Sequence, residues 1–181
     1  MRASLIALLL GLSTAAHAGA PAIPTGDLAA LLKVRTLRHI SFEALQACAS
    51  FNEPGTLEAL TQYSNIWMAR YAVLARRLDL LYMGLPTELT GPYEQSYRKR
   101  WSVGDSALDT LTRMKQSERN DACKAVVQRL LPSIADPEAI LTSHRSSLAR
   151  IMSITDTDVQ RLTQQLYTDP DVRNAVARLI N

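Results

Sequence analysis

Apolar side chains recur every three or four residues through most of this 181-residue chain, and no stretch alternates as a half-buried strand does. The clearest stripe runs along residues 56–83 and comprises Leu57, Leu60, Tyr63, Trp67, Tyr71, Leu74, Leu78 and Leu81. An apolar face of this width must be covered by other helices. The sequence therefore predicts an all-α single-domain bundle of about six or seven helices.

Start and stop signals divide this pattern into separate helices. Asp136-Pro137 and Asp169-Pro170 each place a capping residue before a first-turn proline. Thr155 with Asp158 resembles a capping box, and Ser117 is expected to cap a shorter helix through the following apolar residues. The other predicted helices span residues of about 27–50, 56–83, 92–116, 136–153, 156–167 and 170–180.

Two of these helices contain a residue that disturbs regular helix. Ser41 lies in the middle of the first helix, which could be broken there. Gly104 falls on the apolar stripe of the 92–116 helix, with Tyr93, Tyr97 and Trp101. A glycine there costs about 1 kcal/mol relative to alanine, and it would let a neighbouring backbone approach closely.

The helix predicted for residues 56–83 has a second, narrower apolar ridge. Ile66, Val73 and Leu80 recur every seven residues on the side away from the main stripe. A helix that is apolar on two sides is usually central in its bundle, and this is the interpretation we favour. The alternative is that the ridge is a docking surface for a partner.

The first eighteen residues have the layout of a secretory signal peptide. Met1-Arg2 is a short basic start, residues 5–12 are apolar, and Ala16-His17-Ala18 is a small-x-small cleavage site. The apolar run is far shorter than the roughly 20 residues that span a bilayer. We therefore expect cleavage after Ala18, a periplasmic location and no membrane span in the mature chain, with residues 19–26 as an irregular lead-in to a helical domain of residues 27–181.

Cys48 and Cys123 are the two cysteines of the chain, and each lies on an apolar helix face. In an exported protein such a pair predicts a disulfide, which requires Cα atoms within about 7 Å. Two buried thiols or metal ligation are the alternatives, but no C-x-x-C or H-x-x-x-H spacing supports a metal site.

Charge and motifs exclude several classes of function. Removal of residues 1–18 lowers Lys+Arg from 20 to 19 against 17 Asp+Glu, which leaves a net charge of +2. This charge is far below the dense positive field of a typical nucleic-acid binder, so we expect no nucleic-acid partner. No phosphate loop, dinucleotide fingerprint or G-x-S-x-G motif is present, and we expect no cofactor and assign no catalytic residue.

Arg98-Lys99-Arg100 is the densest basic cluster and the place where we expect an anionic partner to bind. The neighbouring aromatic residues belong to the core stripe, and solvated charges are the interpretation we favour over a cooperative aromatic-basic site. His144 lies between apolar residues and is predicted to be a core or boundary histidine paired with a carbonyl or carboxylate, rather than a catalytic group. His39 and Glu43 are four residues apart, which permits a side-chain pair on one helix.

Three classes of function remain open. We expect a non-enzymatic binding or inhibitor protein of the bacterial periplasm that contacts a protein partner in the cell envelope, for example to neutralise a secreted toxin or cell-wall enzyme. The first alternative is a lysozyme-like cell-envelope hydrolase or lyase, in which Glu43, Glu53, Glu88 or Glu94 would supply the acid. The second is a periplasmic stress or assembly factor that recognises unfolded clients through exposed apolar surface.

Overall fold

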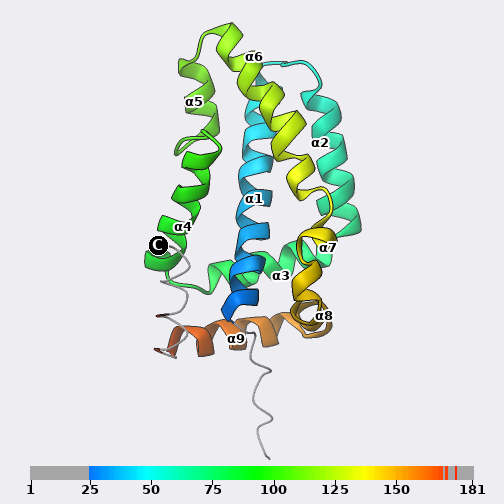
Figure 1. Ribbon diagram of the computed structural model, residues 1–181, viewed down its shortest axis with the longest axis vertical. Helices are drawn as coiled ribbons and strands as arrows, with labels where there is room; N and C mark the ends of the chain where they lie inside the picture. Colours follow the sequence, from blue (N-terminus) through cyan, green and yellow to red (C-terminus); the bar gives the residue numbers. More distant parts are fainter. Residues whose placement is uncertain (1–24, 169, 171–173, 175–181) are drawn as a thin grey trace, which may run out of the picture.

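The computed structural model describes residues 25–168, 170 and 174. Within this part, nine α-helices are joined by short π-helical and 3-10 turns, and no strand is present (Figure 1). The prediction of an all-α single domain is confirmed. The predicted signal peptide, its cleavage site and most of the lead-in lie outside the described residues, as does nearly all of the predicted helix 170–180.

Helix α1 (Thr25–Ser50) runs through the middle of the bundle, with α2 on one side and α4 and α5 on the other (Figure 1). Leu31, Ile40 and Leu45 are fully buried along it. The helix is continuous, so the predicted break near Ser41 is wrong. The Ser41 hydroxyl donates to the Leu37 carbonyl at 2.7 Å and is thereby satisfied inside the helix.

The predicted single helix 56–83 is wrong, because the chain bends in its middle. Helix α2 (Thr56–Ser64) packs along α1, a π-helical turn covers Asn65–Arg70, and α3 (Ala72–Met83) crosses the end of the bundle where α1 begins (Figure 1). Tyr71, at the bend, has φ −112° and ψ 27°. Buried Trp67 and Tyr71 hold this corner, with ring centroids 5.9 Å apart.

The bend also removes the predicted second ridge as a continuous feature. Ile66 and Leu80 are partly buried against the core, whereas Val73 is half exposed. Leu57, which the stripe placed in the core, is 75% exposed at the start of α2. A periodicity counted across a bend does not define one face.

The predicted helix 92–116 is also two helices. Helix α4 (Thr87–Arg100) begins five residues earlier than predicted, and α5 (Ala107–Arg113) follows a loop of residues 101–106. Gly104 lies in this loop at φ 68°, and Ser102 has φ 54°, so both adopt the left-handed conformation that ends a helix. The prediction that Gly104 lies on a helix stripe is therefore wrong.

Helix α6 (Gln116–Ala125) continues through a π-helical turn at Val126–Leu130 and a 3-10 turn at Pro132–Ile134. The Lys115 amide, one residue before α6, donates to Glu118 at 3.0 Å, so the helix begins one residue before the predicted cap at Ser117. The Cys48–Cys123 disulfide joins α6 to α1 with a Cα–Cα distance of 5.7 Å, which confirms the predicted pairing.

In the C-terminal third, two helices begin where the sequence predicts, but one predicted helix is divided. Asp136 accepts from the Ala139 amide at 3.0 Å at the start of α7 (Pro137–Ile140), and Thr155 and Asp158 form the capping box of α9 (Asp156–Thr168). The predicted helix 136–153 is divided, because a 3-10 turn at Thr142–His144 separates α7 from α8 (Arg145–Ser153). Helix α9 packs on α3 and closes that end of the bundle.

Candidate functional site

A network of ion pairs lies between α1, α3 and α4, and Arg98 of α4 is its most buried arginine. The Arg98 guanidinium donates to Glu43 of α1 at 2.6 Å, to Glu94 at 2.9 Å and to the Gly104 carbonyl at 3.2 Å. Only 6% of Arg98 is exposed. The expectation that its charge is solvated is wrong, because Glu94, one turn earlier, and Glu43 draw the side chain inward.

The same network includes further pairs on α1 and α3. Arg35 donates to Asp79 and Glu94, each at 3.3 Å, and its guanidinium carbon lies 3.6 Å from the centre of the Tyr82 ring. The Tyr82 hydroxyl donates to Glu94 at 2.7 Å. Arg38 pairs with Asp79 as well. These contacts lock α3 and α4 onto α1.

Glu43 and Glu94 do not have the electrostatics of a general acid. Burial alone would raise the pKa of Glu43, but hydrogen bonds from Arg98 and the Ala107 amide hold it below its ordinary value. Burial would likewise raise the pKa of Glu94, but hydrogen bonds from Tyr82 and Arg98 outweigh this effect and lower that pKa. The general acid of a glycosidase requires a raised pKa. Glu43 and Glu94 therefore act as ionised hydrogen-bond acceptors and not as such an acid.

The other two candidate glutamates lie apart from this pair. Glu53 is buried and paired with Arg119 at 2.9 Å, near the start of α6. Glu88 is exposed on the first turn of α4. The structure therefore brings Glu43 and Glu94 together and leaves Glu53 and Glu88 separate.

His39 and His144, the two histidines of the described residues, also have carboxylate neighbours. His144 Nδ1 lies 2.6 Å from Asp27, which also accepts from Ser147, so the pair ties the start of α1 to α8. Hydrogen bonds from Ser147 and then His144 lower the pKa of Asp27. This partner is of the kind predicted for His144. His39 Nε2 lies 3.9 Å from Glu94, and burial, followed by the nearby Arg35, lowers the His39 pKa.

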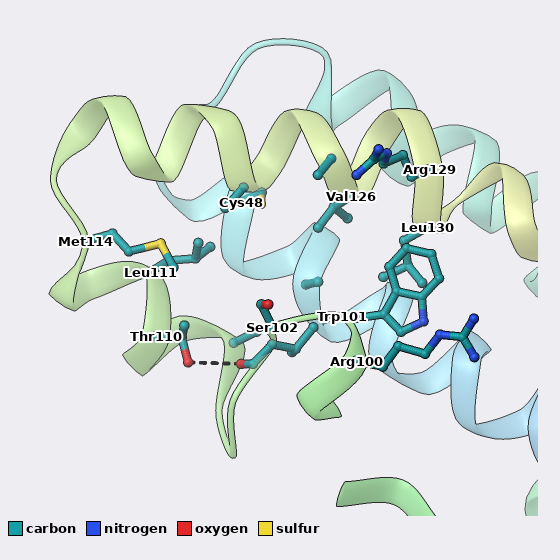
Figure 2. A pocket seen from close by; sticks show the side chains of 15 residues that line it. Cys48, Arg100, Trp101, Ser102, Thr110, Leu111, Met114, Val126, Arg129 and Leu130 are labelled. Atoms are coloured by element: carbon teal, nitrogen blue, oxygen red, sulfur yellow. Dashed lines mark hydrogen bonds between the residues drawn. The ribbon is translucent and has the colours of Figure 1, made fainter. Parts of the chain in front are cut away.

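Beside the Arg98 network, nearer the C-terminal end of α1, a pocket of about 310 Å³ opens between α1, α5, α6 and the 101–106 loop. Figure 2 shows Trp101 between Arg100 and Arg129 at one end, with Leu111 and Met114 at the other. Its apolar lining comprises Ala44, Cys48, Val103, Ala107, Leu111, Met114, Ala122, Ala125, Val126 and Leu130.

The polar groups of the pocket are few and lie beside its apolar wall. The Thr110 hydroxyl lies 2.9 Å from the Val103 carbonyl (Figure 2) and 2.7 Å from the Ser106 carbonyl, so its proton already has an acceptor within the protein. Among the described residues that line the pocket, Arg100 and Arg129 are the two that carry a charge, and both are exposed. Within the described chain neither has a carboxylate of the protein in salt-bridge range.

The predicted Arg98-Lys99-Arg100 cluster is thus divided among three environments. Arg98 is internal, Lys99 is exposed, and Arg100 is at the pocket. Sequence analysis missed Arg129, because no basic residue is adjacent to it in the sequence. It also assigned Trp101 only to a core stripe. Trp101 is in fact partly buried and lines the pocket.

Three further observations bear on function. In the described part, no three His, Cys, Asp or Glu side chains gather closely enough to hold a metal ion. None of the helices found between residues 25 and 168 is both long and apolar enough to cross a membrane. Comparison with protein-family models, with curated proteins and with solved structures found no match to this chain.

Proposed function

We propose that this protein is an exported, non-enzymatic binding protein of the bacterial periplasm, and that the pocket beside the Cys48–Cys123 disulfide is its binding site. The observation that carries the proposal is the combination of an apolar interior with two exposed arginines at one end, neither of which pairs with a carboxylate of the described residues. Small-molecule sites are typically apolar concavities of about 300–1,000 Å³ with a few polar groups that orient the ligand.

The size of the pocket favours a small ligand over the protein partner that the sequence alone suggested. A volume of about 310 Å³ is at the lower end of the range for small molecules. A stable protein–protein interface instead buries about 1,200–2,000 Å² of combined surface. A small ligand can be enclosed by this pocket, whereas a folded partner would cover only its mouth.

The charges near the pocket favour binding over hydrolysis. The paired glutamates that a hydrolase would use lie in the Arg98 network, with lowered pKa values. The charged residues of the described pocket lining are two arginines, and a guanidinium group is not one of the usual general acids or bases of hydrolysis. The two arginines are suited to holding an anion.

A test begins with the exported protein purified from periplasm under native conditions, whose mature chain we expect to start at Gly19. The intact mass of the protein shows at which residue the mature chain starts. Organic extraction after denaturation, followed by mass spectrometry, identifies any small molecule that the protein carries. We expect a stoichiometric small molecule from the native protein and none from Ala125→Phe, because the added ring fills the pocket.

Ala149→Phe is the matched control, since Ala149 is exposed on α8 and does not line the pocket. This variant should carry as much ligand as the native protein. Equal loading of both phenylalanine variants, or a native protein that carries nothing and binds no small molecule in a screen, would contradict the proposal. A retained Met1 with the chain in the membrane fraction would contradict export.

A further inference from the structure

The arginines of this protein fall into two groups that differ in what neutralises them. Seven arginines of the described chain form ion pairs with its own carboxylates: Arg35, Arg38, Arg76, Arg77, Arg98, Arg119 and Arg161. Arg100 and Arg129 form no such pair, and neither do Arg70, Arg113 and Arg145. Of these five described arginines, Arg100 and Arg129 are the two that line the pocket, and they come from different elements. Two positive charges at one end of an apolar hollow are complementary to a ligand with an apolar body and an anionic end.

The chemistry of the guanidinium group favours a carboxylate as that end. Its planar donors match the two oxygens of a carboxylate, and such charge-assisted hydrogen bonds are about twice as strong as neutral ones. Trp101 lies between the two arginines and supplies an apolar surface beside them (Figure 2). The charged end of a ligand would therefore lie near Arg100 and Arg129, with its body toward Leu111 and Met114.

The volume limits the length of that body. At ~30 Å³ for a group the size of a water molecule, 310 Å³ holds about ten non-hydrogen atoms. An unbranched carboxylate of about eight carbons has this size. A lipid with two long chains is several times larger than the hollow.

We infer that this pocket binds a free medium-chain carboxylate such as octanoate, with its alkyl chain between α1 and α6 and its carboxylate at the end of the pocket that Arg100 and Arg129 flank. The inference rests on the pocket being the binding site proposed above. It adds the chemical class of the ligand and assigns the two arginines as the residues that select an anion.

The experiment is calorimetric titration of the exported protein, freed of any carried ligand, with octanoate, octan-1-ol and butyrate. Octanoate should bind one to one and at least ~10-fold more tightly than octan-1-ol, because only the acid makes charged hydrogen bonds. Butyrate should bind far more weakly, since each buried methylene contributes roughly four-fold. Equal affinity for acid and alcohol, or no dependence on chain length, would overturn the inference.

Variants separate the arginines from their surroundings. Arg100→Gln and Arg129→Gln should each weaken octanoate binding by ~10-fold or more and leave octan-1-ol unchanged. Lys99→Gln is the matched control, because Lys99 is exposed beside Arg100 but does not line the pocket. A loss in Lys99→Gln as large as in Arg100→Gln would show general charge attraction and contradict the assignment.

The ligand class and the proposed function fail in different ways. If octanoate does not bind but the purified protein carries another molecule that Ala125→Phe abolishes, the carboxylate inference is wrong and the binding function stands. If octanoate does not bind and no molecule is carried or found by screening, both are wrong. Circular dichroism of each variant confirms that the helices are intact.

Discussion

Two neighbouring regions along α1 use arginine side chains in opposite ways. Toward α3 and α4, Arg98 is buried and its charge is neutralised by Glu43 and Glu94. Toward α5 and α6, Arg100 and Arg129 are exposed and have no carboxylate partner in the described chain. The first arrangement stabilises the fold, and the second leaves charge available to a ligand.

The two regions are connected through the loop of residues 101–106. Arg98 donates to the Gly104 carbonyl, and Glu43 accepts from the Ala107 amide at 2.9 Å, where α5 begins. The same loop carries Trp101 and Val103 into the pocket lining. The ion network therefore positions one wall of the pocket without lining it.

The largest expected effect comes from the disulfide, which ties the pocket wall on α6 to α1. Replacing both Cys48 and Cys123 by alanine should lower the free energy of unfolding by about 4 kcal/mol, because the bridge closes a loop across a sequence separation of 75. Urea denaturation measures the loss, and circular dichroism should show unchanged helix content. A loss below about 1 kcal/mol would show that the bridge contributes little to the fold.

Arg98→Met should be the next most damaging change. It leaves Glu43 and Glu94 without their main partner, and we expect a loss of about 3 kcal/mol in urea denaturation. Lys99→Met, at the exposed neighbouring position, should change stability by no more than about 0.5 kcal/mol. Similar losses in both variants would erase the distinction between the buried and the solvated charge.

The stability of the network side should depend on acid pH. The folded pKa values of Glu43 and Glu94 lie below their ordinary value of 4.5, so their contribution is present above that pH and is lost as pH falls through the folded pKa values. Glu94→Gln should flatten the fall in stability below pH 4.5, because the titrating group is gone. Glu88→Gln on the exposed face of α4 should leave the slope unchanged, and an identical slope for both variants would contradict the role of Glu94.

The smallest stability effect is expected on the pocket side. Arg129→Gln should alter the free energy of unfolding of the ligand-free protein by no more than about 0.5 kcal/mol, because it breaks no ion pair of the described chain. Thermal unfolding without octanoate measures this change in stability, and unfolding with octanoate measures the stabilisation by the ligand. The added ligand should stabilise the native protein more than the variant. A loss comparable to that of Arg98→Met would mean that Arg129 is structural.

Local signals in the sequence determined a large part of this structure. Asp136 and Thr155 begin helices where capping chemistry predicts, and helical periodicity excludes strands throughout the described part. The pairing of Cys48 with Cys123 follows because the chain has no other cysteine. Each of these features depends on neighbours within a few residues or on a residue type with one possible partner.

Tertiary structure decided the bends and, with them, the site. The bend at Tyr71 and the left-handed residues Ser102 and Gly104 interrupt segments whose apolar spacing continues through the interruption, because periodicity records burial and not the direction of the axis. The pocket combines residues 44–48, 100–114 and 122–130, and no local pattern links Arg129 to Arg100. Whether an arginine is buried in an ion pair or free at a pocket depends on which carboxylates packing brings within reach, and that is a property of the folded bundle alone.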